Sequence, residues 1–231
     1  MGTDIYELDG KRKQRTMNKK YTHILWDWNG TLLDDMWLCV DVINALLKKY
    51  NKPVLSLHDY QKHFDFPVKD YYERIGFDFK QTLFEIVGTE FINGYYERWQ
   101  ECKLHQNVED VLRAIRDAGI TQSILSAADV KMLYSGVEMF HLQEYFDELI
   151  GLDHHYAHGK IDVARAYMQR NGLDPATILY IGDTTHDCDV AREINVDVVL
   201  FTNGHHTPAR LENCGVPMID SLRKVLDMLG I

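Results

Sequence analysis

The sequence predicts an α/β protein whose core is a doubly wound parallel sheet and which carries an inserted all-helical segment. Two observations predict the core. Short apolar runs typical of buried strands alternate with helical patterns, and two of those runs end directly in an aspartate. Strands that alternate with helices form parallel β-α units, which gather functional groups at the carboxyl ends of their strands. A third observation predicts the insert, because residues 35–105 contain only helical patterns.

The composition limits the classes of protein that this chain can be. Its 231 residues, 45% of them apolar, suffice for one large domain or for a core with a smaller domain. The net charge of −10 argues against binding to nucleic acid or to an anionic membrane. It does not argue against a small anionic substrate, because a bound divalent cation can reverse the local field.

Cysteine usage and hydropathy point to a cytoplasmic protein. The four cysteines are scattered and form no C-x-x-C pair, so we expect free thiols rather than a disulfide framework or a zinc site. No apolar run is long enough to span a membrane. Residues 1–20 are polar and include the basic run 11–15, which we expect to be a solvated tail, and Met17 offers a second translation start.

Apolar runs predict the strands of the core. They have the length of strands and are rich in Ile, Leu and Val. In chain order they are His23–Asp27, Gln122–Ser126, Glu148–Leu152, Ile178–Asp183, Asp197–Thr202 and the shorter Pro217–Ile219. We therefore assign residues 21–34 and 106–231 to the core.

The core helices are predicted from their start and stop signals as well as from periodicity. Asn107 is placed to cap a helix that runs to Ala118, and Gly119 would end it. Asn171-Gly172 would end a helix that begins near residue 161. The other expected core helices are 129–140, 187–193 and 221–229.

The segment 35–105 is expected to form a separate helical bundle. Its helices are predicted at 36–50, 56–64 and 67–75, with one or two more at 80–99. Ser56 can cap the second, and Pro67 suits the first turn of the third. The many aromatic residues of this segment are expected mostly to form the core of the bundle, rather than a cofactor site or a base-stacking surface.

Two of the predicted strands end in carboxylates that could do chemistry together. Asp27 ends the first run, and Asn29-Gly30 turns the chain directly after it. A carboxylate is already ionised at neutral pH and can attack phosphorus to form an aspartyl-phosphate. Asp183 ends the fourth run, and Asp187 lies one helical turn later. Three such carboxylates form a hard oxygen site of the kind that Mg²⁺ prefers.

Four segments resemble, in order, the motifs of the haloacid dehalogenase superfamily. Asp27-x-Asn29-Gly30-Thr31-Leu32 resembles the first motif, D-x-D-G-T-L, and Gly182-Asp183-x-x-x-Asp187 resembles the fourth, G-D-x-x-x-D. Between them, Ile124-Leu125-Ser126-Ala127 resembles the second motif, a strand that ends in Ser or Thr. Lys160, which opens a predicted helix, resembles the third. The resemblance extends from about residue 20 to the C-terminus.

The resemblance implies a Rossmann-like core with a helical cap, of the phosphoglycolate phosphatase-like kind. It implies Mg²⁺-dependent hydrolysis of a small phosphorylated metabolite, such as phosphoglycolate or a sugar phosphate, through an aspartyl-phosphate. The catalytic residues that it implies are Asp27, Asn29, Ser126 and Lys160. The implied Mg²⁺ ligands are Asp27, Asp183, Asp187 and the backbone carbonyl of Asn29. The implied substrate contacts are Gly30, Thr31, Ser126, Ala127 and Lys160.

Lys160 also stands out on physical grounds. A cation at a helix N-terminus is unfavourable, so a lysine there is expected to have other partners, namely the carboxylates and the phosphate. Three histidines precede it, at positions 154, 155 and 158. We expect these to form a solvated loop rather than a metal site.

Asn29 departs from the family pattern. The phosphatases of this family have an aspartate there that acts as general acid and base, a role typically worth about 10²–10⁴ in rate. An amide cannot perform it. We favour a phosphatase that uses water, another side chain or an acidic leaving group. The alternatives are a C–P bond hydrolase similar to phosphonoacetaldehyde hydrolases, with Lys48, Lys49 or Lys52 as Schiff base, and a phosphate-binding module that has lost turnover.

Overall fold

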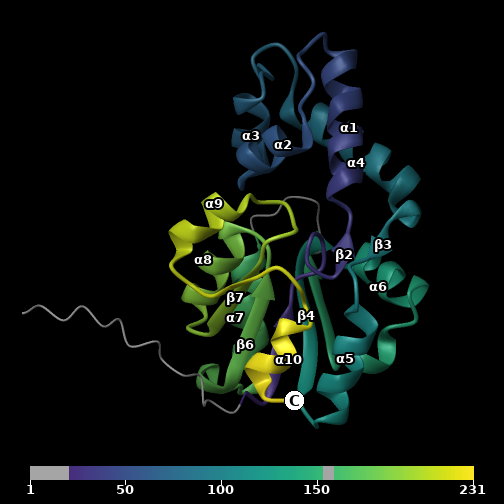
Figure 1. The fold of residues 1–231 in the computed structure, drawn as a ribbon. Helices are drawn as coiled ribbons and strands as arrows, with labels where there is room; N and C mark the ends of the chain where they lie inside the picture. Colours follow the sequence, from purple (N-terminus) through teal and green to yellow (C-terminus); the bar gives the residue numbers. More distant parts are fainter. Residues whose placement is uncertain (1–20, 153–158) are drawn as a thin grey trace, which may run out of the picture.

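The computed structural model of the chain describes residues 21–152 and 159–231 (Figure 1). The expected tail at 1–20 and the histidines His154, His155 and His158 lie outside the described residues. The predictions made for those positions therefore remain predictions.

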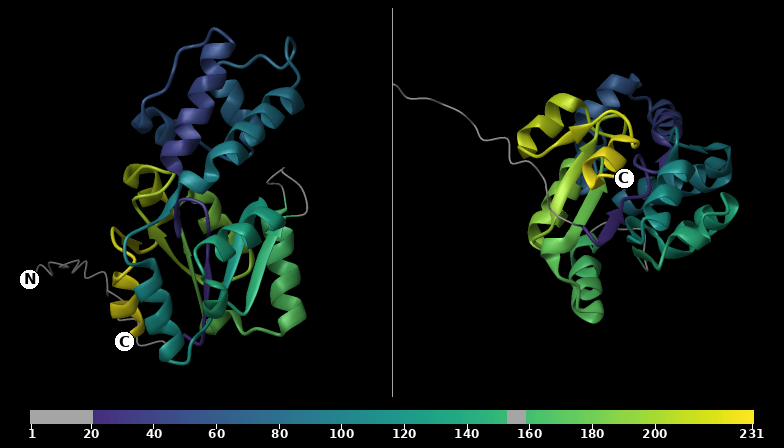
Figure 2. Two further views of the ribbon diagram at one scale, coloured as in Figure 1. Left: turned by 90° about the vertical axis from the view of Figure 1, so that its right-hand side faces the viewer. Right: turned by 60° about the horizontal axis from the view of Figure 1, so that its bottom comes forward.

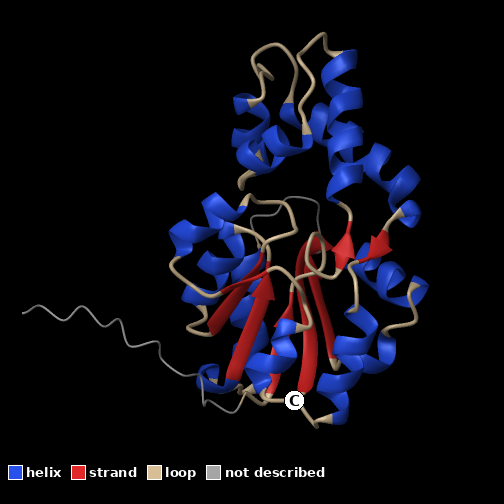
Figure 3. Cartoon of the chain, in the orientation of Figure 1, coloured by secondary structure: helices blue, strands red, loops and turns tan. Residues whose placement is uncertain are grey.

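Within the described residues, a parallel sheet of six strands forms the core, in the order β5-β4-β1-β6-β7-β8 (Figure 3). The strands are β1 (His23–Trp26), β4 (Thr121–Asp129), β5 (Glu148–Leu152), β6 (Ile178–Gly182), β7 (Asp197–Phe201) and β8 (Met218–Ile219). The central strand β1 pairs with β4 on one side and with β6 on the other. This arrangement confirms the predicted fold class.

Helices cover both faces of the sheet (Figures 1 and 2). They are α5 (Val108–Asp117), α6 (Val130–Met139), α7 (Lys160–Asn171), α8 (Thr185–Glu193), α9 (Pro208–Leu211) and α10 (Lys224–Leu229). On one face, Ile24 and Trp26 of β1 pack against residues of α5, α6 and α10. On the other face, Leu25 packs against residues of α7, α8 and α9. Alternate residues of β1 thus enter opposite cores, as a doubly wound sheet requires.

The helical insert lies above the carboxyl ends of the strands (Figure 1). It consists of α1 (Met36–Lys49), α2 (Leu57–His63), α3 (Val68–Arg74) and α4 (Phe84–Arg98), and it has its own apolar core. The chain enters the insert through β2 (Leu33–Asp34) and leaves through β3 (Lys103–Leu104). These two short strands pair antiparallel, with Asp34 opposite Lys103.

Several local predictions need correction. Asn107 is the residue before α5, but its φ is 65° and its side chain makes no capping bond. Capping residues normally have extended backbone, so the left-handed conformation removes the predicted cap. The strand predicted to end at Ser126 continues to Asp129, because a register shift after Leu125 lets Asp129 pair with Leu152. The helix predicted from residue 80 begins only at Phe84.

Other local predictions are confirmed. The Ser56 side chain accepts a hydrogen bond from the Asp59 backbone N–H at 3.1 Å and so caps α2. All four cysteines are free. None of the described helices has the length and apolar character needed to cross a membrane.

Candidate active site

The carboxyl ends of β1 and β6 bring three aspartates together. Asp27 directly follows β1, and its backbone N–H donates to the Ile181 carbonyl of β6 at 2.8 Å. Asp183 follows β6, and Asp187 lies in the first turn of α8. Carboxylate oxygens of the three residues lie within 4.8 Å of one another, and all three side chains are buried.

Lys160, the first residue of α7, reaches into this group of carboxylates. Its Nζ lies 2.5 Å from Oδ1 of Asp27 and 2.7 Å from Oδ1 of Asp187, and the side chain is only 3% exposed. Burial lowers the pKa of Lys160, but the charges of Asp187 and Asp27 outweigh this effect and raise it above its usual value. The ammonium group therefore remains charged in the interior of the protein.

Asp187 has its hydrogen-bonding capacity filled. Its Oδ1 accepts from Lys160 and, at 2.8 Å, from the Tyr180 hydroxyl. Its Oδ2 accepts from the Thr184 backbone N–H at 2.9 Å and from the Thr184 hydroxyl at 2.7 Å, in a capping box that opens α8. Burial raises the pKa of Asp187, but Lys160 and Thr184 lower it below its usual value. Asp187 is thus an ionised anchor for Lys160.

Asp183 is held by two groups that converge on it from other segments. Its Oδ1 accepts from the Thr31 hydroxyl at 2.9 Å, and its Oδ2 accepts from the His205 backbone N–H at 2.6 Å. A side chain at Gly30 or Gly204 would overlap this carboxylate, so both close approaches require glycine. Burial raises the pKa of Asp183 to about 6, with the Asp187 charge adding to the effect.

The charge of this cluster is unbalanced. Burial and the charges of Asp187 and Asp183 raise the pKa of Asp27, while Lys160 opposes the rise. Three buried carboxylates face one ammonium, so the ionised cluster carries an excess of two negative charges. Buried charge without compensation is strongly unfavourable. A divalent cation would balance the cluster, and carboxylate oxygens are the ligands that Mg²⁺ prefers.

The remaining predicted site residues fall into two groups. Ser126 and Ala127, in β4, line a cavity next to Asp27 and Lys160. The Ser126 Oγ accepts from the Ala128 backbone N–H at 3.0 Å. Gly30 and Thr31, predicted as substrate contacts, do not line this cavity. Their polar groups are used inside the protein, since Thr31 donates to Asp183 and the Gly30 N–H donates to Asp35 at 2.9 Å.

Asn29 is held by a carboxylate that the sequence analysis did not single out. Its side-chain Nδ2 donates to Oδ2 of Asp35 at 2.7 Å and lies 3.0 Å from the Tyr95 hydroxyl. That hydroxyl also donates to Asp35 at 2.8 Å. Asp35 precedes α1 and Tyr95 belongs to α4, so this hydrogen-bond network connects the core to both long helices of the insert.

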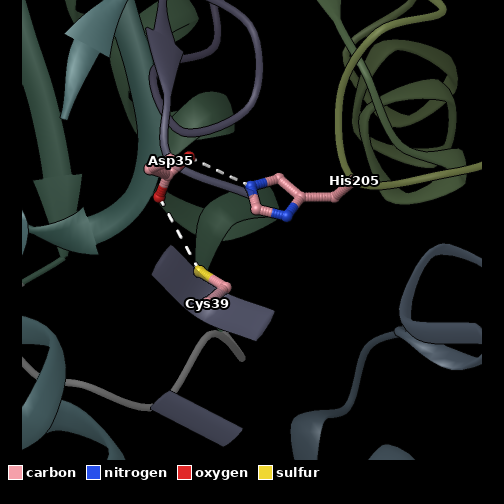
Figure 4. A group of neighbouring side chains, drawn as sticks. All are labelled: Asp35, Cys39 and His205. Carbon is pink, nitrogen blue, oxygen red and sulfur yellow. Dashed lines mark hydrogen bonds and ion pairs between the residues drawn. The ribbon is translucent and has the colours of Figure 1, made fainter. Parts of the chain in front are cut away.

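Asp35 also belongs to a second buried cluster, with Cys39 and His205 (Figure 4). The Nε2 atom of His205 lies 3.2 Å from Oδ1 of Asp35, and the Nδ1 atom lies 3.0 Å from the Tyr60 hydroxyl of α2. Burial lowers the pKa of His205, but Asp35 raises it to about 9, so the ring is charged at neutral pH. These ligand types would suit zinc. Here they hydrogen-bond to one another.

His205 could have been found from the sequence in the same way as Asp27, by looking for polar residues directly after a predicted strand. It lies in the polar segment 202–206, directly after the end of β7. The carboxyl ends of neighbouring parallel strands meet at one edge of the sheet, so this segment was also a candidate. Asp35 carried no such signal, because its role depends on contacts with distant residues.

A cavity of about 810 Å³ lies between the insert and the core. Asp27, Ser126 and Lys160 line its core side. Its insert side is lined largely by aromatic residues, among them Phe66, Tyr71, Phe84, Phe91, Tyr96 and Trp99. The expectation that these aromatics serve mainly the bundle core is therefore incomplete.

Lys48, Lys49 and Lys52, considered above for an imine mechanism, do not line this cavity. Lys49 instead pairs with Glu90 at 2.6 Å, and Lys52 donates to the Gly76 carbonyl. The geometry thus gives no support to a Schiff base formed by these lysines.

Comparisons with known proteins agree with this fold and geometry. The sequence profile of the family described as haloacid dehalogenase-like hydrolase matches residues 24–201. The phosphoglycolate phosphatase of Pseudomonas putida is 23% identical, over 88% of this chain and 78% of that protein. The phosphoglycolate phosphatase of Synechococcus elongatus is 22% identical, over 78% of this chain and 84% of that protein.

A solved structure has the same fold. A haloacid dehalogenase-like family hydrolase from Streptococcus pneumoniae superposes with a TM-score of 0.78 at 20% identity, and the match covers 90% of this chain and 97% of that one. The segment matched by the family profile runs from β1 to the end of β7 and includes all four segments that resemble the motifs. The chain therefore belongs to the haloacid dehalogenase-like hydrolase family.

Proposed function

We propose that this protein is a Mg²⁺-dependent phosphatase that hydrolyses a small phosphate monoester through an aspartyl-phosphate on Asp27. One observation carries the proposal: the Asp27 carboxylate lies at a buried strand end, beside Lys160 and Asp183, and lines a cavity. Two relatives named phosphoglycolate phosphatase support a phosphate ester as the substrate class.

In the proposed mechanism, a carboxylate oxygen of Asp27 attacks phosphorus while the bond from phosphorus to the alcohol oxygen breaks on the opposite side, and the leaving oxygen takes its proton from water. Lys160 and the Ser126 hydroxyl bind phosphate oxygens and stabilise their charge in the transition state. Water then attacks the phosphorus of the aspartyl-phosphate, which releases phosphate and restores the Asp27 carboxylate. We propose that residues 35–105 act as a cap that opens to admit substrate and closes to exclude bulk water.

Mg²⁺, when bound, would offset the repulsion between the Asp27 carboxylate and the phosphate dianion. We assign its ligands to Asp27, Asp183 and the backbone carbonyl of Asn29. Asp187 was expected as a further ligand, but it would have to exchange one of its existing hydrogen bonds to reach the ion. We therefore propose that Asp187 acts by positioning Lys160.

The decisive experiment is an Asp27→Asn substitution assayed by phosphate release. Loss of the nucleophile should reduce turnover of acetyl phosphate and p-nitrophenyl phosphate roughly 10⁴-fold while the fold is retained. Asp189→Asn is the matched control, because Asp189 is exposed on α8 close to the site and should be dispensable. Wild-type turnover in the Asp27 variant would refute the mechanism. A wild-type protein that binds phosphate without hydrolysing either acetyl phosphate or p-nitrophenyl phosphate would favour a binding module.

A further inference from the structure

The cavity above Asp27 is much larger than a two-carbon acid requires. Its volume of about 810 Å³ falls within the range of roughly 300–1,000 Å³ that is typical of pockets for drug-sized ligands. The phosphate would occupy the core side, beside Lys160 and Ser126. The alcohol portion of the substrate would then occupy the insert side.

Aromatic rings are the commonest side chains of the wall on that side. Phe84, Phe91 and Trp99 contribute aromatic rings from the insert, and Trp28 and Met132 contribute apolar surface from the core. Aromatic side chains offer large flat apolar surfaces, which favour ring-shaped ligands through offset or edge-to-face contacts. The polar wall residues Thr89 and Asn93 are outnumbered by these rings, so an apolar ring buries more surface here than a polyhydroxyl chain would.

Among the described residues, the cavity wall offers more negative than positive side chains to a second anionic group. Lys160 is already held by two carboxylates. Lys69 is exposed and places its Nζ 6.0 Å from the centre of the Phe79 ring. Glu85 and Asp129 add negative charge to the wall. A substrate carboxylate on this wall would have only the exposed Lys69 as a cation and would face the charges of Glu85 and Asp129, which is unfavourable.

Two buried polar atoms of the cavity wall lack hydrogen-bond partners among the described residues. They are the Tyr71 hydroxyl and the Nε2 atom of His186, whose ring lies 4.8 Å from that of Phe66. An unpaired buried polar atom costs about 1–3 kcal/mol, but both atoms are covered by protein, so a ligand could pair with one only if a neighbouring side chain moved. The polar groups at the cavity surface are therefore few beside its aromatic rings, which suits a ring with at most one or two polar substituents.

The side chain at position 29, next to the reacting bond, also favours an aromatic alcohol as the leaving group. The Asn29 amide does not titrate, and its nitrogen is already used by Asp35. Phenol-type oxygens, with a pKa of about 10, leave far more readily without protonation than aliphatic ones, whose pKa lies nearer the value of about 15.7 for water. An aromatic alcohol thus suits both the cavity wall and the amide at position 29.

We propose that the substrate is a phosphate monoester of an apolar aromatic alcohol that carries at most one or two hydrogen-bonding substituents. This proposal rests on the phosphatase function proposed above. It excludes phosphoglycolate and sugar phosphates as the preferred substrates of this chain.

The test compares kcat/KM for five phosphates in the presence of Mg²⁺. 2-Naphthyl and phenyl phosphate differ in ring area, cyclohexyl phosphate keeps the apolar ring but has an aliphatic leaving group, and glucose 6-phosphate and phosphoglycolate are polar. We expect the order naphthyl, phenyl, cyclohexyl, with both polar esters at least roughly 10²-fold below the naphthyl ester. Either polar ester matching the naphthyl ester would overturn the proposal.

Acetyl phosphate separates this proposal from the function on which it rests. It is small and activated, so its cleavage needs the phosphate site but not the aromatic wall. If acetyl phosphate is cleaved in an Asp27-dependent manner while the polar esters have a higher kcat/KM than the aromatic ones, only the proposed substrate class is wrong. If acetyl phosphate is not cleaved at all, the phosphatase function fails and the substrate class fails with it.

A pair of variants tests the wall itself. Phe91→Leu, which alters a cavity-lining ring, should lower the ratio of naphthyl to acetyl phosphate kcat/KM about tenfold. Phe79→Leu is the matched control, because Phe79 lies in the insert but not in this cavity, and the ratio should stay at the wild-type value. An unchanged ratio in a folded Phe91→Leu variant would count against the proposal.

Discussion

The amide at position 29 suits this site because Asp35 already supplies a carboxylate next to it. The Asn29 side chain donates to Asp35, which also accepts from the Gly30 N–H and from Tyr95. Asp35 is completely buried, and burial opposes its charge, but His205 and these donors lower its pKa below its usual value. Position 29 therefore requires a hydrogen-bond donor next to the buried carboxylate of Asp35.

An Asn29→Asp substitution should destabilise the protein for this reason. It replaces a donor 2.7 Å from Asp35 by a second carboxylate, and the expected loss is about 1–3 kcal/mol in the free energy of unfolding at neutral pH. Urea unfolding at pH 7 measures it. The double variant Asn29→Asp/Asp35→Asn restores a donor–acceptor pair and should recover part of the loss. A single variant as stable as the wild type would show that the two side chains do not interact in this way.

Lys160 holds together two carboxylates that would otherwise repel each other in the interior. Lys160→Met leaves both without their cation, and breaking a buried ion pair of this kind typically costs about 3–5 kcal/mol. Unfolding curves with EDTA and with Mg²⁺ measure the effect, and Mg²⁺ should reduce the loss. Lys131→Met, at an exposed position near the start of α6, should change stability by about 0.5 kcal/mol or less. Equal losses in the two variants would contradict the anchoring role.

The rule that functional groups gather at strand ends found much of the site from the sequence. It singled out Asp27 and Asp183, which the structure brings together with Asp187. It could not show that Thr31 would face Asp183 instead of the cavity, because that contact joins loops 152 residues apart in the chain. Nor could it place Asp35, whose partners come from α4 and from the segment after β7.

At the scale of elements, the sequence predicted what depends on local patterns. The buried strands and the core helices appear within a few residues of their expected bounds, because apolar periodicity reports burial on one or two faces. β2 and β3 were not predicted, since two residues carry no periodicity. The extension of β4 to Asp129 depends on a register shift against β5, which is a tertiary contact.

Helix packing around the site makes a further prediction through two glycines. A methyl group at Gly136 of α6 would lie 2.8 Å from the Trp28 ring, so Gly136→Ala should overpack this contact at a cost of about 1–3 kcal/mol. Gly88 of α4 has 3.9 Å to the nearest atom, Cζ of Phe84, so Gly88→Ala should stabilise the protein by up to about 1 kcal/mol. Chemical denaturation of both variants measures the change in the free energy of unfolding, which should be a loss for Gly136→Ala and a gain for Gly88→Ala. Stabilisation by both would mean that Trp28 moves aside freely.

For the whole molecule, the three buried carboxylates and one ammonium at the strand ends leave an excess of negative charge that should lower the stability of the fold. A divalent cation that binds only the folded state should raise the free energy of unfolding by about 2.7 kcal/mol at a hundred times its Kd. Thermal denaturation with Mg²⁺ and with EDTA measures this shift. Asp183→Asn should abolish most of it, whereas Asp189→Asn should preserve it. Identical melting with and without Mg²⁺ in the wild type would refute a cation site in this cluster.

The antiparallel pairing of β2 with β3 has a consequence for the evolution of this chain. Asp34 lies opposite Lys103 in this pair of strands. The two ends of an insert of roughly 70 residues are therefore held side by side, as the ends of a short hairpin turn would be. The entropy of closing a loop grows only with the logarithm of its length, by about 0.6 kcal/mol for each doubling. Loop-closure entropy therefore sets little limit on the length of the chain between these two residues, provided that contacts such as those of Asp35 are kept. The insert can therefore change in length and sequence, and the substrate preference with it, while the reacting groups at the strand ends stay in place.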